Sequence, residues 1–260
     1  LVLQNAWDNN GTIELDAGRL YLYGDRATEN LNQSTLVREA GSYVYLAGSL
    51  DNTGDLLSQV GTIDFIGGSV TGGTSSVDFN ATSNAAEFAD GVTLDANLNL
   101  GSSGSSFEIR NGLTLNGTAN LWGSGATLDF AGTQTLGASP GQSATVDMVP
   151  FNSVLRVTDG GTLTLDDTVT VSGEGYVSGY GAGNTVVNEG LIHADHGNGY
   201  LRITSETFTN TGTLRASGDG SLVLQNAWDN NGTIELDAGR LYLYGDRATE
   251  NLNQSTLVRE

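Results

Sequence analysis

The residues most suggestive of chemistry form the run His193-Ala194-Asp195-His196. Two histidines and a carboxylate are ligand types that hold zinc when they converge on one point. On a strand, His193 and Asp195 would share a face, whereas the second histidine would fall in the turn that follows. Alignment with the next two segments of similar pattern gives His193 the outward position that Arg215 and Glu235 take there. The pattern favours a solvated surface cluster, with a metal site as the alternative.

Oxygen-rich turns form a second group of candidate ligands, because calcium prefers carboxylate and amide oxygens. They are Asp8-Asn9-Asn10-Gly11, Asp51-Asn52-Thr53-Gly54-Asp55 and Asp195-His196-Gly197-Asn198-Gly199. None has the spacing of an EF-hand loop, and the glycine-rich nonapeptide of calcium-binding β-helices does not occur. We expect ordinary turn chemistry and no cofactor, with weak surface calcium binding as the alternative.

Tyrosines alternate with apolar residues in two segments, at Tyr21 and Tyr23 and again at Tyr43 and Tyr45. Matching the apolar residues of the two segments places Tyr21 beside Tyr45 on an outer surface. Exposed aromatic stacks can contact sugar rings or another protein. Rings on neighbouring strands also stabilise a sheet by packing on one another. We expect the packing role, with surface contact as the alternative for all four.

Composition excludes several classes of protein. Thirty acidic and ten basic residues give a formal charge of −20, and every basic residue is an arginine. A chain this acidic repels nucleic acids and anionic membrane surfaces. No cysteine is present, which excludes a disulfide scaffold, and no apolar run reaches the ~18 residues of a membrane span. We therefore expect neither nucleic-acid binding nor membrane insertion.

A long internal repeat determines how the chain is organised. Residues 1–39 recur letter for letter as residues 222–260, an offset of 221. Such identity indicates a tandem array with a 221-residue unit. We expect residues 1–260 to be one continuous window of that array, with 1–221 as one unit and 222–260 as the start of the next copy. Flanking copies of the unit are then the first expected partners.

A shorter repeat of about 21 residues lies inside the long one. Its clearest copies align on Gly190, Gly212 and Gly232, which are 22 and 20 residues apart. In each copy, apolar and polar residues alternate over two short segments, as in strands with one buried face. Coils of about 20–23 residues that stack like over like would pair their backbones from coil to coil. The pattern predicts an all-β fold, a parallel β-solenoid.

Asparagines recur at one position of this short repeat, at Asn188, Asn210 and Asn230, and Asn52 stands in a similar setting. An asparagine at an inward corner can donate to the coils above and below it. The residue two places earlier is apolar in the three later copies, which favours an inward corner. We expect these four asparagines to be ladder residues, with plain surface turns as the alternative.

The middle of the chain is less regular. Residues 67–89 and 140–152 lack a clear register, and we expect loops that project from the solenoid there. The segment 83–90 is the single short candidate for a helix.

The pattern N-x-G-T-[LI]-x-[AL] followed by G-x-L-x-L resembles the β-helical repeats of large Gram-negative adhesins, of the filamentous-haemagglutinin and autotransporter-passenger type. The resemblance covers residues 186–260 and 1–66 well, and the middle in style only. It implies a right-handed parallel β-helix, export and display at the cell surface. It brings no catalytic residues with it.

These observations favour a structural or adhesive stalk of a large extracellular bacterial protein, and not an enzyme. End-to-end self-association and a carbohydrate or host-surface partner would fit that role. A polysaccharide-cleaving β-helix is the alternative, but it needs a groove of converging acids that the sequence does not show. An ice- or sugar-binding face is a further alternative, suggested by four threonines of one segment, Thr162, Thr164, Thr168 and Thr170.

Overall fold

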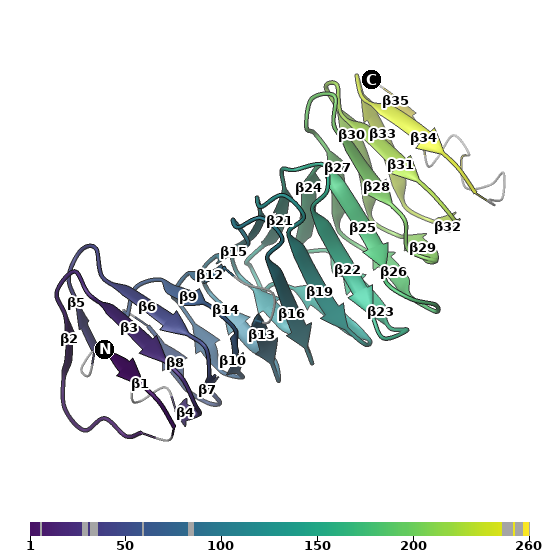
Figure 1. The fold of residues 1–260 in the computed structure, drawn as a ribbon. Coiled ribbons are helices and arrows are strands. Elements are labelled where there is room, and N and C mark those ends of the chain that lie inside the picture. The colour runs from purple at the N-terminus through teal and green to yellow at the C-terminus, as the bar shows by residue number, and fades with distance from the viewer. Residues whose placement is uncertain are drawn as a thin grey trace.

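The fold is an elongated stack of coils, and the N- and C-termini of the chain lie at opposite ends of this stack (Figure 1). The computed structural model describes residues 1–5, 7–27, 31, 36–58, 60–82, 86–245, 252 and 257–259. Among these residues there is no α-helix, and all pairing between named strands is parallel. About 11 turns of chain stack on one another, which confirms the predicted all-β parallel β-solenoid.

Three long sheets run along the stack, with one short sheet near the N-terminal end. The first sheet contains β1 (Val2–Leu3), β3 (Arg19–Leu22), β6 (Tyr43–Leu46), β9 (Ile63–Phe65), β12 (Phe79–Ala81), β15 (Leu98–Asn99), β18 (Thr118–Leu121), β21 (Ala144–Met148), β24 (Val169–Gly173), β27 (Leu191–Ala194), β30 (Thr213–Ser217), β33 (Thr233–Asp237) and β35 (Leu257–Arg259). The second sheet contains β4 (Arg26–Ala27), β7 (Ser49–Asp51), β10 (Gly68–Thr71), β13 (Ala86–Ala89), β16 (Ser106–Arg110), β19 (Thr127–Ala131), β22 (Val154–Thr158), β25 (Gly175–Gly179), β28 (Tyr200–Ile203), β31 (Ser221–Leu224) and β34 (Arg240–Leu243). The third sheet contains β8 (Leu56–Leu57), β11 (Thr74–Ser75), β14 (Val92–Leu94), β17 (Leu113–Leu115), β20 (Gln134–Gly137), β23 (Thr162–Leu165), β26 (Thr185–Asn188), β29 (Thr207–Asn210) and β32 (Ala227–Asn230), and the short sheet contains β2 (Ile13–Leu15) and β5 (Leu36–Arg38).

Coil length varies more than the sequence pattern indicates. Near the C-terminal end, neighbouring coils are offset by 22 and 20 residues, within the expected range. In the middle, Asn80 bonds to Asp64 of the preceding coil across 16 residues, and Arg156 bonds to Asp129 across 27. Turns between strands absorb this variation, because the strands themselves keep their pairing.

The expectation of projecting loops in the middle is wrong. Residues 67–89 contain β10 to β13, and residues 140–152 contain β21, all paired within the three long sheets. The helix candidate is also wrong where it is described, because residues 86–89 form β13; residues 83–85 lie outside the described residues. These strands carry glycine, serine and alanine, so short side chains conceal an ordinary strand pattern from sequence reading.

The inside of the solenoid is a continuous apolar core. Phe65, Phe79, Phe88 and Phe107 are all fully buried and pack on one another, with ring centroids 4.7 to 5.3 Å apart along the chain of contacts. Burying a phenylalanine side chain stabilises a fold by about 1.5–3 kcal/mol. Each coil contributes such residues from its alternate positions, so the core grows with the number of coils.

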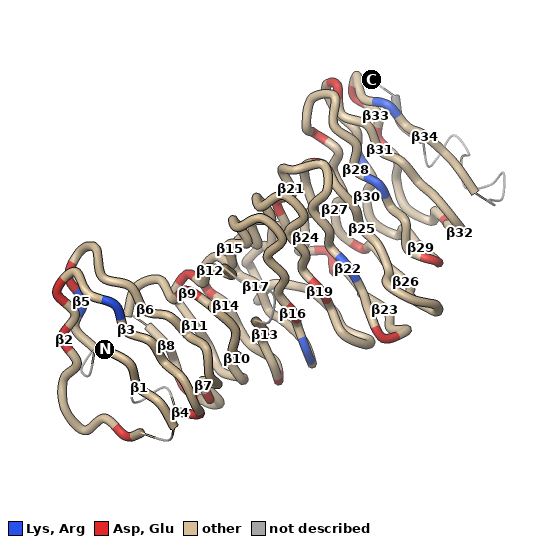
Figure 2. The backbone as a smooth tube through the Cα atoms, viewed as in Figure 1, with Lys and Arg blue, Asp and Glu red and all other residues tan. Residues whose placement is uncertain are grey.

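Charges lie outside this core. Figure 2 shows acidic residues spread along the length of the stack, with few basic ones between them. A two-point ion pair joins β22 to β19, where Arg156 donates to both carboxylate oxygens of Asp129 at 2.6 and 2.7 Å. Among the described residues, no helix is long and apolar enough to cross a membrane.

Close backbone contact explains the recurring glycines of the short repeat. A Cβ atom added at Gly212 would lie 2.2 Å from the carbonyl oxygen of Gly190, and one added at Gly232 would lie 2.1 Å from that of Gly212. Real Cβ atoms do not approach backbone atoms so closely. Glycine at this corner therefore allows the backbones of successive coils to pack in direct contact.

We predict that Gly212→Ala destabilises the protein by about 1–3 kcal/mol, because the methyl group would push two coils apart. Gly197→Ala is the matched control, since nothing lies within 4 Å of its added Cβ. The control should change stability by no more than about 0.5 kcal/mol. Chemical denaturation of both variants measures the difference, and equal stability would contradict the close stacking of these corners.

Candidate functional site

Three of the predicted asparagines form one ladder inside the solenoid. Asn188, Asn210 and Asn230 end the strands β26, β29 and β32, and all three are buried. The side-chain amide of Asn188 donates to the side-chain oxygen of Asn210 at 2.7 Å, and Asn210 donates to Asn230 at the same distance. Each side chain thus bridges to the next coil, which stabilises the stacking of like corners.

The ladder begins at Asn188, and it does not include Asn52. The side-chain oxygen of Asn188 has no hydrogen-bond partner among the described residues, and its neighbour in the preceding coil is Leu165. Asn52 is also fully buried, but it donates to the backbone carbonyl of Thr74 in the next coil at 2.8 Å. The structure therefore brings three of the four together and gives Asn52 a separate, similar role.

Three of the four predicted tyrosines, Tyr21, Tyr43 and Tyr45, stack on one another. The rings of Tyr21 and Tyr45 stack with centroids 4.8 Å apart, and Tyr43 lies 6.1 Å from Tyr45. The guanidinium of Arg19 lies 6.0 Å from the ring of Tyr43, and Tyr23 is exposed just beyond β3. Because Tyr21 and Tyr45 stack, one face of each ring is closed to an approaching sugar.

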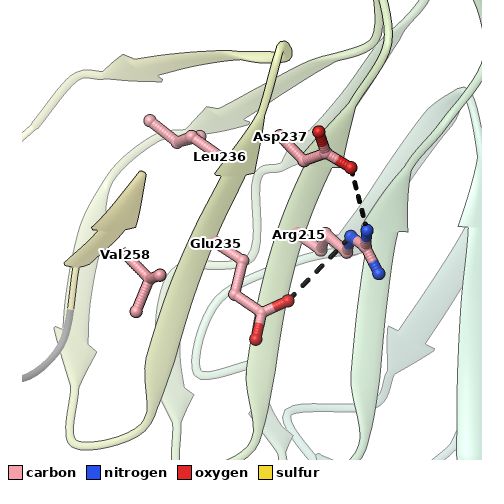
Figure 3. A pocket seen from close by; sticks show the side chains of 5 residues that line it. All are labelled: Arg215, Glu235, Leu236, Asp237 and Val258. Atoms are coloured by element: carbon pink, nitrogen blue, oxygen red, sulfur yellow. Dashed lines mark hydrogen bonds and ion pairs between the residues drawn. The ribbon is translucent and has the colours of Figure 1, made fainter. Parts of the chain in front are cut away.

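Charged side chains gather on the outer side of the first sheet around Arg215 (Figure 3). Its guanidinium lies 3.1 Å from a carboxylate oxygen of Asp237 and 3.9 Å from one of Glu235. Together with Leu236 and Val258 these three residues line a shallow hollow. Two of its charged members sit in the repeated segment and one in the coil before it.

His193 lies in the same outer surface, one coil earlier. Its Nε2 atom is 2.8 Å from the hydroxyl oxygen of Ser217, and its Nδ1 atom is 3.7 Å from a carboxylate oxygen of Asp195. Burial lowers the pKa of His193, against the opposing effect of Asp195. Sequence reasoning did not single out Ser217, although alignment of the coils puts it between Asp195 and Asp237 in one outward column.

This serine, histidine and aspartate do not have the geometry of a hydrolytic triad. A triad needs the carboxylate hydrogen-bonded to the histidine, and 3.7 Å is beyond hydrogen-bond range. It also needs free N–H groups near the serine to hold an oxyanion. The neighbouring N–H of Gly218 already donates to the carbonyl of Asp237 at 2.9 Å. The arrangement is that of a polar network that links coils.

The two histidines face different neighbours. His193 points to Ser217, whereas His196 lies 4.0 Å from a carboxylate oxygen of Glu174. Within the described ranges, no group of three or more histidine, aspartate or glutamate residues could hold a metal ion. Weak calcium binding at the surface turns stays a prediction.

Comparison of the chain with protein-family models, with curated proteins and with solved structures found no match. The assignment of function therefore depends on the fold, the repeat and the contacts described above.

We predict that Asn210→Ala destabilises the protein more than His193→Ala. Losing Asn210 would remove the two buried side-chain hydrogen bonds that join it to Asn188 and to Asn230, each worth about 0.5–1.5 kcal/mol. Losing His193 removes one hydrogen bond at a half-buried position, worth about 0.5–1.5 kcal/mol. Denaturant titration of both variants gives the comparison. Equal losses would contradict the ladder, and a large histidine effect that depends on added zinc would support the metal site.

Proposed function

We propose that this chain is a module of a rod-like stalk, in which successive 221-residue units continue one β-solenoid. The β-solenoid fold fits such a repeated structural module. The observation that carries the proposal is the strand pairing of the duplicated segment. This segment occurs at both ends of the described solenoid, and its two copies pair in the same register.

The two identical segments pair their strands in the same register. At the N-terminal end Val2 pairs with Tyr21, and at the C-terminal end the equivalent Val223 pairs with Tyr242. The same holds for a second pair of strands, because β2 pairs with β5 as β33 pairs with β35. One sequence thus stacks in one way, whether coils precede it or follow it.

The first copy is exposed on the side where coils would precede it, and the second copy is exposed on the side where coils would follow it. Val2 is 53% exposed at the start of the solenoid, whereas the equivalent Val223 is 4% exposed because coils precede it. At the other end the relation is reversed, since Leu20 is fully buried and the equivalent Leu241 is only partly buried. The ends of a unit are therefore complementary to the ends of further units.

Three kinds of contact cross the boundary between residues 221 and 222. The asparagine ladder crosses it from Asn210 to Asn230, and the Arg215–Asp237 ion pair crosses it on the outside. In the third sheet, Phe208 and Trp228 are register partners and both are buried. Core, ladder and surface continue through the boundary, as a stalk requires.

Adhesion and display on a bacterial cell surface belong to the same proposal. Their support is the resemblance of the N-x-G-T repeats to those of large surface adhesins, together with the solenoid fold. The four tyrosines Tyr21, Tyr23, Tyr43 and Tyr45 are the proposed surface for a carbohydrate or host partner. The proposal includes no catalytic role, because the Ser217–His193 pair lacks an orienting carboxylate at hydrogen-bond distance.

We also propose that separate chains associate end to end. Among the described residues, β1 and β34 are the outermost strands of their sheets and pair on one side only, and such edges are templates for further pairing. The exposed Val2 and the partly buried Leu241 lie at these edges. Such association would depend on protein concentration.

The stalk predicts a fixed gain of length for each unit. The first sheet takes ten steps from β3 to β33, and strands lie about 4.7–4.9 Å apart, so a unit should add about 50 Å. Small-angle scattering of proteins with one, two and three units measures this gain. Equal increments at constant cross-section support the stalk. Beads joined by flexible linkers, or a globular shape, would contradict it.

A further inference from the structure

Identical sequences occupy different sheets at the two ends of the solenoid. Strands β1 and β3 belong to the first sheet, but their copies β31 and β34 belong to the second. Strands β2 and β5 form the short sheet, but their copies β33 and β35 belong to the first. The local pairing of the copies is unchanged, so the difference concerns their place around the solenoid axis.

The order of the strands explains this change of sheet. Along the chain the strands visit the first, second and third sheets in turn, as β30, β31 and β32 do. Strand β5 follows β4 of the second sheet and precedes β6 of the first, so it holds the position of the third sheet. Each copy has therefore advanced by one position. Ten coils lead from β3 to β33, and β34 comes one strand later, so a unit contains ten coils and about a third of another.

We propose that each 221-residue unit turns the array by one sheet. This inference rests on the proposed stalk, in which unit follows unit without a break. A side chain that faces outward from the first sheet in one unit then faces outward from the second sheet in the next unit, and from the third in the unit after that. The original placement returns after three units.

The shift determines which surfaces meet at each junction. Arg202 of the second sheet is the register partner of Val223, and its guanidinium lies 4.6 Å from the ring of Tyr200 and 5.4 Å from that of Tyr176. The ring of Tyr242, the copy of Tyr21, lies 5.9 Å from Tyr200. The tyrosines of each new unit therefore extend a tyrosine–arginine surface of the unit before it.

A unit with a whole number of coils would build a different junction. The copied strands would then return to the first sheet, where the outward column before them contains His193 and Arg215. The tyrosines would follow this charged network, and all units would present them on one side of the rod. The observed shift instead distributes the tyrosines over three sides of the rod. If a unit is bent, the next unit bends in a different direction, because it is rotated about the solenoid axis.

Disulfide cross-linking tests the shift in the chain itself, which has no cysteine of its own. The variant with Arg202→Cys and Val223→Cys places thiols on register partners of the second sheet and should form an internal disulfide under mild oxidation. The variant with Arg215→Cys and Val223→Cys is the matched control, since it joins different sheets, and it should keep both thiols free. Mass spectrometry of the monomer counts the free thiols.

The outcomes separate this inference from the stalk. Cross-linking of the control pair alone would mean that Val223 lies against β30 and not on β28 of the second sheet, which overturns the shift. Failure of both pairs would mean that the second copy does not stack, which overturns the stalk and the shift together. Cryo-electron microscopy of a protein of two complete units extends the test: the copy of β6 should lie on β34 in the second sheet, and its return to the first sheet would overturn the proposal.

Discussion

Every coil of this protein must give its backbone N–H and C=O groups to the coils before and after it. A strand in such a stack has no partner inside its own coil, so pairing is lost unless the next coil places a strand at the same position. This constraint selects like over like at inward positions. It accounts for the phenylalanine contacts between β9, β12, β13 and β16, for the asparagine ladder and for glycines whose missing side chains let the corners touch.

The same constraint leaves the outside free to vary. One outward column of the first sheet runs through Tyr21 and Tyr45 to Asp64, and further on through His193 to Arg215. The core tolerates this change because none of these side chains enters it. A rod can therefore carry tyrosines, amides and ion pairs in succession on one sheet, and its surface properties are set locally while its stability comes from the stack.

Sequence patterns predicted the features that repeat and missed those that do not. The neighbouring tyrosines Tyr21 and Tyr45 and the spacing of Asn188, Asn210 and Asn230 follow from alignment of regular coils. Strands such as β11, with two residues, contain too few side chains to show a period, and coil offsets of 16 and 27 residues break the alignment. The contact between His193 and Ser217 joins different coils and columns, so local spacing does not indicate it. The sheet on which a copy lies depends on the number of strands between the two copies. A local sequence pattern does not give this number.

Hydrogen exchange across the unit boundary tests the continuous solenoid most directly. In a protein of two complete units, the boundary amide of Thr233, which donates to Gly212 at 2.9 Å, lies far from both ends. It should exchange as slowly as the amide of Thr213, which donates to Gly190 at 2.8 Å within one unit. Exchange of Thr233 at the rate of exposed loop amides, with Thr213 still protected, would mean that units fold as separate bodies and would contradict the account.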